Sequence, residues 1–398
     1  MSKVCWLVLF GLVMMAAACT SSEQATSKPL IAKQATLTSE TVLTHSPDPT
    51  RLSSPFPSVT APTTSLPTEV PPTPTLSPGL ASLRIAFGYD HKLWLWQNAI
   101  PRPLTGLESH ALFKISDDGE IIAFARDGLW TIHSDGSNER LLVSADDFKS
   151  MQPSDPGVAL NDFDWIPGTH SLFFNTILLA DYGLSYTDDL YVANAETTQW
   201  KMLRQPGKGG RFFISPDGQR VALTTPTQIS LMNVDNSNYR VVMEYWVPFP
   251  SEVAYYASPT WATDSQSLTV PILPEDFFYG TQLPTVVWRL PIDGTPPTVV
   301  SELSAGDDGD DDRIWSANHE HFAIWYEGAY QLDMEGTDLN PLTELGAAEG
   351  WFTWVDETHF IYLGDCALRL GTIGSPSILI ADLKMTDDNC SSRYDFAK

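Results

Sequence analysis

The chain has 398 residues, of which 43% are hydrophobic, and this is enough apolar material for one large core or two ordinary ones. Its 49 acidic and 23 basic residues give a net charge of −26, and so negative a surface repels nucleic-acid phosphates and anionic lipid headgroups. A nucleic-acid partner is therefore excluded. The 30 prolines and 25 glycines favour a chain rich in turns over a helical bundle.

The N-terminus has the pattern of an export signal. A short basic start leads into an apolar run from Val4 to Ala18, which is too short for an ordinary membrane-spanning helix. Three alanines precede Cys19, and this ending resembles the bacterial lipobox, in which the cysteine becomes the lipidated first residue of the mature protein. We therefore predict a lipoprotein signal peptide over residues 1–18 and lipidation at Cys19. The alternative is ordinary secretory cleavage at the same alanines.

Residues 19–80 are predicted to be a stalk. More than half of this segment is Ser, Thr or Pro, so it buries too little apolar surface to offset its ordering entropy. We expect a disordered, extended linker that tethers an acidic domain near a membrane. The predicted location is outside the cytoplasm in a bacterial cell envelope, with the lipid anchor as the only membrane contact.

Two cysteines, Cys366 and Cys390, remain in the part of the chain that follows the stalk. In an oxidising compartment we predict that they form one disulfide, which would stabilise the fold by roughly 3 kcal/mol in the chain-entropy model. Two free buried thiols are the alternative.

From residue 83 onward one pattern recurs. Each copy combines a strand end, a tight turn built on Asp, Asn, Gly or Pro, and an apolar strand. The best copies are Ile115–Phe124 and Ile214–Leu223, and weaker ones begin at Trp165, Trp261, Trp315 and Trp354. A third strand, a polar turn and a fourth short strand follow. Four strands per unit at a spacing of roughly 40 to 50 residues are typical of a β-propeller blade.

The Ser-Pro-Asp-Gly turn, the strand after it and the following Asp-Gly turn resemble the WD40-like repeats of TolB-type propellers. The resemblance covers nearly all of residues 83–390 and implies an all-β fold, with a propeller domain over residues 81–398. It carries over no catalytic residue, because the repeat residues are structural. We count seven four-stranded blades, with six as the alternative. The first blade lacks an inner strand, so the tail around Arg393–Phe396 is expected to pair with it as a clasp.

Nearly every long insertion is predicted to lie on one face of the propeller, because loops between strands two and three share an end with the connections between blades. Function on rigid scaffolds concentrates on such loops. The insertions are Leu178–Asp188, Leu273–Pro284 and Asp365–Pro376 within blades, and Ser144–Asp162, Glu244–Ser258 and Ser304–Arg313 between them.

Aromatic residues gather in two of these insertions, next to carboxylates, and such surfaces suit a peptide or a sugar. The ligand-face candidates are Tyr245, Trp246, Tyr255, Tyr256, Phe277, Phe278 and Tyr279. The alternative is that these side chains fold back to cover blade ends.

An acidic run supplies the candidate metal ligands, Asp307, Asp308, Asp310, Asp311 and Asp312. Their oxygens suit calcium, although the spacing is not that of an EF-hand loop. A solvated acidic loop is the alternative, and no other cofactor is indicated.

The sequence therefore predicts an anchored binding module for an envelope protein, peptide or glycan. No catalytic residue is assigned, because neither a Gly-x-Ser-x-Gly elbow nor a His-Glu-x-x-His motif occurs. One alternative is a glycan hydrolase with carboxylates in the central pocket, although nothing selects a pair. The other is a structural envelope protein stabilised by calcium.

Overall fold

The computed structural model describes residues 80–108, 111–151, 157–180, 183–247, 254–279, 283–302, 313–316, 321–326, 329–334, 343–347, 352–364, 366–383 and 393–398, all within one compact unit, Thr73–Lys398. The predicted signal peptide, Cys19, the predicted stalk up to residue 79, Cys390 and the acidic run Asp307–Asp312 lie outside the described residues. Within the described part, no helix is long and apolar enough to span a membrane.

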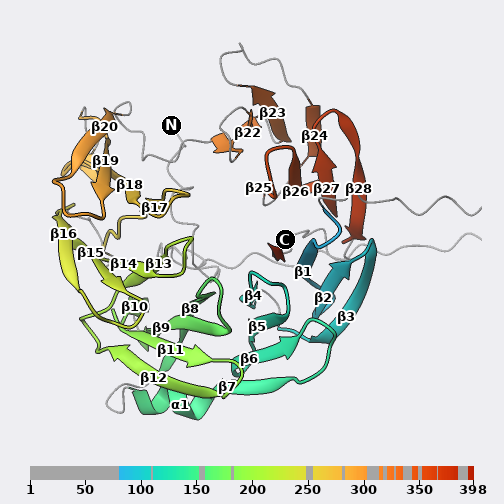
Figure 1. The fold of residues 1–398 in the computed structure, drawn as a ribbon, viewed down its shortest axis with the longest axis horizontal. Helices are drawn as coiled ribbons and strands as arrows, with labels where there is room; N and C mark the ends of the chain where they lie inside the picture. The colour runs from blue at the N-terminus through green and yellow to red at the C-terminus, as the bar shows by residue number, and fades with distance from the viewer. Residues whose placement is uncertain are drawn as a thin grey trace, which may run out of the picture. The chain divides into compact units, whose positions relative to one another are not determined.

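The described residues form seven antiparallel sheets, which are drawn in Figure 1. The first consists, in spatial order, of β29 (Tyr394–Ala397), β1 (Arg84–Tyr89), β2 (Lys92–Gln97) and β3 (Ile100–Gly106). The second consists of β4 (Phe113–Ile115), β5 (Ile121–Ala125), β6 (Gly128–His133) and β7 (Arg140–Ser144). The third consists of β10 (Gly183–Tyr186), β9 (Ser171–Ala180), β11 (Leu190–Asn194) and β12 (Gln199–Arg204), with β8 (Val158–Trp165) also paired to β9.

The later sheets repeat the four-stranded meander. The fourth consists of β13 (Arg211–Ile214), β14 (Arg220–Thr225), β15 (Gln228–Asn233) and β16 (Arg240–Glu244). The fifth consists of β17 (Thr260–Trp261), β18 (Ser267–Ile272), β19 (Val286–Pro291) and β20 (Thr298–Glu302). The sixth consists of β21 (Arg313–Trp315), β22 (His321–Tyr326), β23 (Ala329–Met334) and β24 (Thr343–Ala347). The seventh consists of β25 (Phe352–Trp354), β26 (His359–Gly364), β27 (Ala367–Thr372) and β28 (Ser375–Asp382).

The repeat turn owes its shape to one carboxylate and one glycine. Between β4 and β5, Ser116 Oγ donates to Asp118 Oδ1 at 2.6 Å, and the backbone amide of Glu120 donates to the same oxygen at 2.9 Å. Gly119 takes a φ of +70°, which is a left-handed conformation that costs glycine little. The turn between β13 and β14 repeats this geometry, with Asp217 as the acceptor. The Ser-x-Asp-Gly motif is therefore a structural device.

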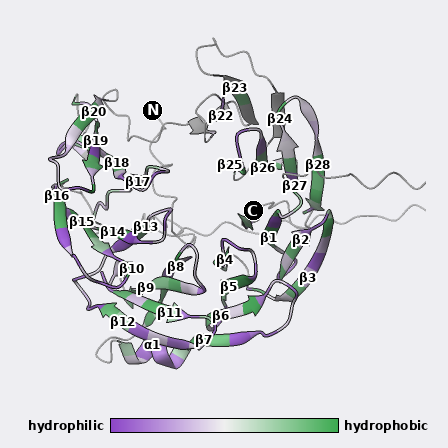
Figure 2. Cartoon of the chain, in the orientation of Figure 1, coloured by the Kyte–Doolittle hydropathy of each residue, from purple (hydrophilic) through white to green (hydrophobic). Residues whose placement is uncertain are grey.

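The core lies between sheets. The middle strands are continuously apolar and buried, as in β5 and β14, so that each of these sheets presents an apolar face to the neighbour on either side (Figure 2). Separate buried clusters join the first sheet to the second, the second to the third, the third to the fourth, and the fourth to the fifth. Two more join the sixth to the seventh and the seventh back to the first. This arrangement confirms the all-β propeller. No such cluster among the described residues joins the fifth sheet to the sixth, and the count of seven blades in a closed ring stays a prediction.

The predicted C-terminal clasp is confirmed. β29 pairs antiparallel with β1, with Phe87 opposite Tyr394 and Arg84 opposite Ala397. The first sheet thus takes its innermost strand from the end of the chain, next to β1 in Figure 1. The Tyr394 hydroxyl also donates to the carbonyl of Ile361 in the seventh sheet at 3.0 Å.

Two predicted loops are regular structure instead. Asp365–Pro376 was predicted as a long insertion, which is wrong: half of it is β27, which pairs with both neighbouring strands and buries Leu368 and Leu370. Leu178–Asp188 holds the hairpin of β9 and β10, because β9 continues to Ala180. Cys366 follows β26 with a φ of +56° and is disulfide-bonded, and its predicted partner Cys390 lies outside the described residues.

Two short helices also fall within predicted insertions. Helix α1 (Ala145–Met151) begins with a reciprocal cap, in which the Asp147 amide donates to Ser144 Oγ and the Ser144 amide donates to Asp147 Oδ2. The 3₁₀ helix η2 (Phe277–Tyr279) lies between β18 and β19.

Candidate functional site

Charged side chains line the innermost strands of three consecutive sheets. Lys114 on β4, Asp164 on β8 and Asp395 on β29 hold equivalent positions, each opposite the third residue of the next strand. Along β4 and β8 the residues on either side are buried, so the alternation turns these charges away from the core. We call these three residues, together with Asp162 and Arg393, the inner-strand cluster. Part of it lines a cavity of about 120 Å³.

The side chains of the inner-strand cluster are closely surrounded by protein atoms but still in contact with water. Asp162 and Asp164 remain accessible to water, while protein atoms surround them on several sides. Burial raises the pKa of Asp162 to about 6, with the neighbouring charge of Asp164 adding to the shift and Lys114 opposing it. Burial likewise raises the pKa of Asp395 to about 6, against the opposing charge of Lys114 and a hydrogen bond of 2.8 Å from the Ile115 amide.

Lys114 is the cationic centre of this group. Burial by itself would lower the pKa of Lys114, but the carboxylates of Asp164 and Asp395, followed by that of Asp162, together raise it. The cluster thus holds a charged amine among carboxyl groups of which at least two take up protons near pH 6. Such an arrangement can bind a polar ligand or exchange protons with one.

The Asp162→Asn variant is expected to change how stability depends on pH. Because folding raises the pKa of Asp162 above 3.8, the folded chain holds this proton more tightly than the unfolded chain does. Wild-type stability should therefore fall as the pH rises from about 4 to about 6. At pH 7 we expect the variant to be more stable by about 1 kcal/mol, a value reduced for water access to the carboxylate, and the difference to shrink towards pH 5.

Thermal melts of both chains between pH 5 and 8 measure this difference. The exposed carboxylate Asp90 provides a matched control, because Asp90→Asn removes a charge outside the inner-strand cluster. A pH profile of Asp162→Asn that runs parallel to that of the wild type would contradict the raised pKa.

The long-loop face brings two predicted insertions together. The Tyr256 hydroxyl, from Glu244–Ser258, donates to both carboxylate oxygens of Asp188, at 3.0 and 3.1 Å. The Tyr186 and Tyr256 rings meet edge to face with centroids 4.8 Å apart. Burial raises the pKa of Asp188 to about 6, although the bond from Tyr256 lowers it. The hairpin of the third sheet and the connection after the fourth sheet thus form one polar and aromatic surface.

The predicted ligand-face aromatics divide into two groups. Tyr245 is 8% exposed and its hydroxyl accepts from the Ala257 amide, so it belongs to the core between the fourth and fifth sheets. Tyr255 and Phe277 pack against that same core. Trp246 and Tyr279, in contrast, are 63% and 66% exposed.

The Phe278 side chain lies outside the described residues. Trp246 and Tyr279 are thus exposed on separate insertions, Tyr256 is bound to Asp188, and the other three aromatics pack into the core between the fourth and fifth sheets.

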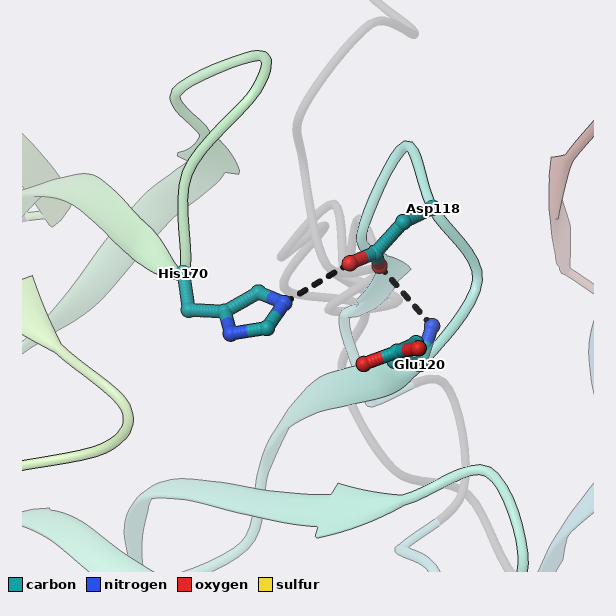
Figure 3. Close-up of side chains that lie close together, drawn as sticks. All are labelled: Asp118, Glu120 and His170. Atoms are coloured by element: carbon teal, nitrogen blue, oxygen red, sulfur yellow. Dashed lines mark hydrogen bonds and ion pairs between the residues drawn. The ribbon is translucent and has the colours of Figure 1, made fainter.

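A third group of side chains was missed by the sequence analysis. Asp118 and Glu120, from the turn between β4 and β5, meet His170 from the equivalent turn before β9 (Figure 3). His170 Nε2 lies 2.7 Å from Asp118 Oδ2, and His170 Nδ1 lies 2.9 Å from Glu196 Oε1. The hydrogen bonds with Glu196 and Asp118 raise the pKa of His170. These residues belong to different repeat copies, so only the stacking of sheets reveals that they meet.

Comparisons with known proteins identify no family for this chain. No protein-family model matches the chain, and no curated protein matches it. Similar solved structures include TolB from Acinetobacter baumannii, at 15% identity and a TM-score of 0.37 over 64% of this chain and 61% of that one. An oligogalacturonate lyase from Vibrio parahaemolyticus matches at 11% identity and a TM-score of 0.46, over 71% of this chain and 84% of that one.

A puromycin hydrolase carrying the S511A mutation matches at 14% identity and a TM-score of 0.47, over 77% of this chain and 52% of that one. At these identities and TM-scores the fold assignment rests on the sheets themselves. The chain is an all-β propeller, and TolB proteins are among the solved structures similar to it.

Proposed function

We propose that this protein is a lipid-anchored binding module of the cell envelope, which recognises a protein, peptide or glycan through its long-loop face. The observation that carries the proposal is the contact of Tyr256 with Asp188, because it joins two insertions that are far apart in the sequence. Loops held to each other in this way lose less conformational entropy when a ligand binds.

The chemistry of this face supports the proposal. Trp246 and Tyr279 each leave about two thirds of their surface in water, although large aromatic side chains favour burial. Exposed aromatics of this kind supply much of the free energy at binding surfaces, since they offer large contact areas with few rotatable bonds. The buried Tyr245 and the half-buried Tyr255 and Phe277 fasten the same insertions to the core. The propeller is the rigid frame, and the stalk would give reach.

Replacing Trp246 and Tyr279 together by alanine is expected to weaken partner binding by about 5- to 100-fold, which corresponds to about 1–3 kcal/mol. The fold should remain intact, because both side chains are exposed. The measurement is a quantitative pull-down of the lipidated chain from its own envelope in mild detergent. Leu379→Ala is the control, since Leu379 is 52% exposed on β28 and belongs to neither insertion.

A partner retained equally by the double variant and the control would contradict the proposed face.

A second candidate function, hydrolysis of a glycan, is supported by the inner-strand cluster, where carboxyl groups with pKa values of about 6 lie beside a cavity. A general acid and a second carboxylate are what glycoside hydrolysis needs. Absence of any partner together with release of sugar from envelope glycans would favour that function. The calcium-stabilised role depends on Asp307–Asp312, outside the described residues.

A further inference from the structure

We propose that Asp118, Glu120 and His170 bind a divalent transition-metal ion, Zn²⁺ being the best suited, where the second sheet meets the third. This site lies apart from the long-loop face and does not depend on the proposed binding partner. One ligand atom from each of the three side chains lies within 4.8 Å of the other two. Figure 3 shows His170 and Asp118 directed at each other, with the Glu120 carboxylate beside them.

The distances suit zinc after a small adjustment. Tetrahedral Zn²⁺ places its nitrogen and oxygen ligands about 2.0–2.2 Å away, which separates neighbouring ligand atoms by about 3.4 Å. His170 Nε2 and Asp118 Oδ2 are 2.7 Å apart and would have to separate by less than 1 Å. Glu120 is exposed, so its side chain is free to rotate towards the ion. Three protein ligands leave the fourth position to water.

The groups around the ligands already hold them in the orientation that a metal requires. Glu196 Oε1 lies 2.9 Å from His170 Nδ1, and a proton held there leaves the Nε2 lone pair free for the ion. Asp118 Oδ1 accepts from Ser116 Oγ and from the Glu120 amide, so Oδ2 remains for the metal. A carboxylate, a histidine and a metal in line are a recurrent arrangement at zinc sites.

The negative charge around His170 favours a divalent cation over a single proton at Nε2. The carboxylates of Asp118, Glu120 and Glu196 surround a single imidazole, so even the protonated imidazole leaves a local charge of −2 on these four groups. Two arginines lie nearby, but the bonds of Arg84 and Arg140 go to the backbone carbonyls of Asp118 and Glu196. A divalent ion in place of the Nε2 proton would relieve the repulsion between the carboxylates.

The imidazole ligand decides which ion fits. Imidazole nitrogen with carboxylate oxygen suits zinc and its transition-metal neighbours, whereas calcium prefers a shell made of oxygen alone. The proposed site is therefore chemically distinct from the predicted calcium ligands Asp307–Asp312. By joining two repeat turns, the ion would also fasten the second sheet to the third.

Titration of the untagged full-length chain with ZnCl₂ after chelator treatment, followed by calorimetry and thermal melts, tests the proposal. We expect one equivalent of Zn²⁺ to bind this site and raise Tm, with no competition from Ca²⁺. His170→Gln and Glu120→Gln should each abolish binding of that equivalent. Glu196→Gln should weaken it about 10- to 100-fold, because Glu196 only orients the imidazole.

Glu120→Gln separates a metal site from a purely structural ion pair. The ion pair joins His170 to Asp118 and Glu196, so a structural role alone predicts no effect of Glu120→Gln on zinc binding. His359→Gln is the matched control, because His359 pairs with Asp356 outside this cluster. Failure of the wild type to bind Zn²⁺ would overturn the proposal. Undiminished binding by both His170→Gln and Glu120→Gln would overturn it as well.

Discussion

A chain that ends at residue 392 is expected to be less stable by about 4 kcal/mol or more, which corresponds to a Tm lower by about 6 °C or more. The deleted segment contains β29, the strand that completes the first sheet. Without it, β1 would present an unpaired edge where Arg84 to Phe87 now bond to Tyr394 to Ala397.

The loss should exceed that of one edge strand, because β29 touches three sheets. The Tyr394 hydroxyl donates to the Ile361 carbonyl in the seventh sheet, and Asp395 Oδ2 accepts from the Ile115 amide in the second. Ala397 is buried in the cluster between the first and second sheets. Truncation therefore removes the strand together with its contacts to the seventh and second sheets.

Two controls separate strand pairing from side-chain bonds. Tyr394→Phe retains the strand and loses only the hydroxyl, so we expect a cost of about 1 kcal/mol. A synthetic peptide of residues 393–398, added to the truncated chain, should recover part of the lost Tm by mass action. A truncated chain that melts at the same temperature as the full-length chain would show that β29 does not hold the first, second and seventh sheets together.

The repeat pattern was sufficient to predict the sheets because it is local. A serine, an aspartate and a glycine within four residues specify the turn, and the apolar run that follows specifies the buried second strand. The clasp was predictable by elimination, since the first blade lacked an inner strand. The prediction of a loop over Asp365–Pro376 failed because the apolar alternation that marks β27, at Leu368 and Leu370, extends over only a few residues.

The inner-strand cluster could be predicted only in part. Asp162 and Asp164 alternate with apolar residues along β8, which indicates a strand with one polar face. That Lys114 and Asp395 join them depends on which strand of each sheet is innermost and on how the sheets follow one another. The meeting of His170 with Asp118 depends on the same stacking, since each residue taken alone belongs to an ordinary turn.

Exposure is the other property that the sequence did not reveal. Tyr245 and Trp246 are adjacent, yet one is 8% exposed and the other 63%. The difference arises because the Tyr245 hydroxyl accepts from the Ala257 amide and anchors the connection to the core. Buried and exposed side chains thus occur within the same predicted set, and the ligand face stays a prediction.

Trp165→Ala is expected to destabilise the chain by about 3–5 kcal/mol, because Trp165 is 4% exposed in the core between the second and third sheets. Its indole Nε1 also donates to the Lys114 carbonyl at 3.0 Å. The same bond recurs two sheets later, where Trp261 Nε1 donates to the Phe213 carbonyl at 2.9 Å. Tryptophan at the start of a repeat copy therefore supplies apolar volume and satisfies a carbonyl on the innermost strand of the preceding sheet.

Trp165→Phe separates these two contributions, since phenylalanine retains most of the apolar volume and cannot donate. We expect it to cost about 1–2 kcal/mol, less than the alanine variant. Trp246→Ala, at an exposed tryptophan, should change stability by no more than about 0.5 kcal/mol. Chemical denaturation of the three variants measures all of these values. If Trp165→Phe were as destabilising as Trp165→Ala, the hydrogen bond to Lys114 and not the packing would join these sheets, and the inner-strand cluster would depend on it directly.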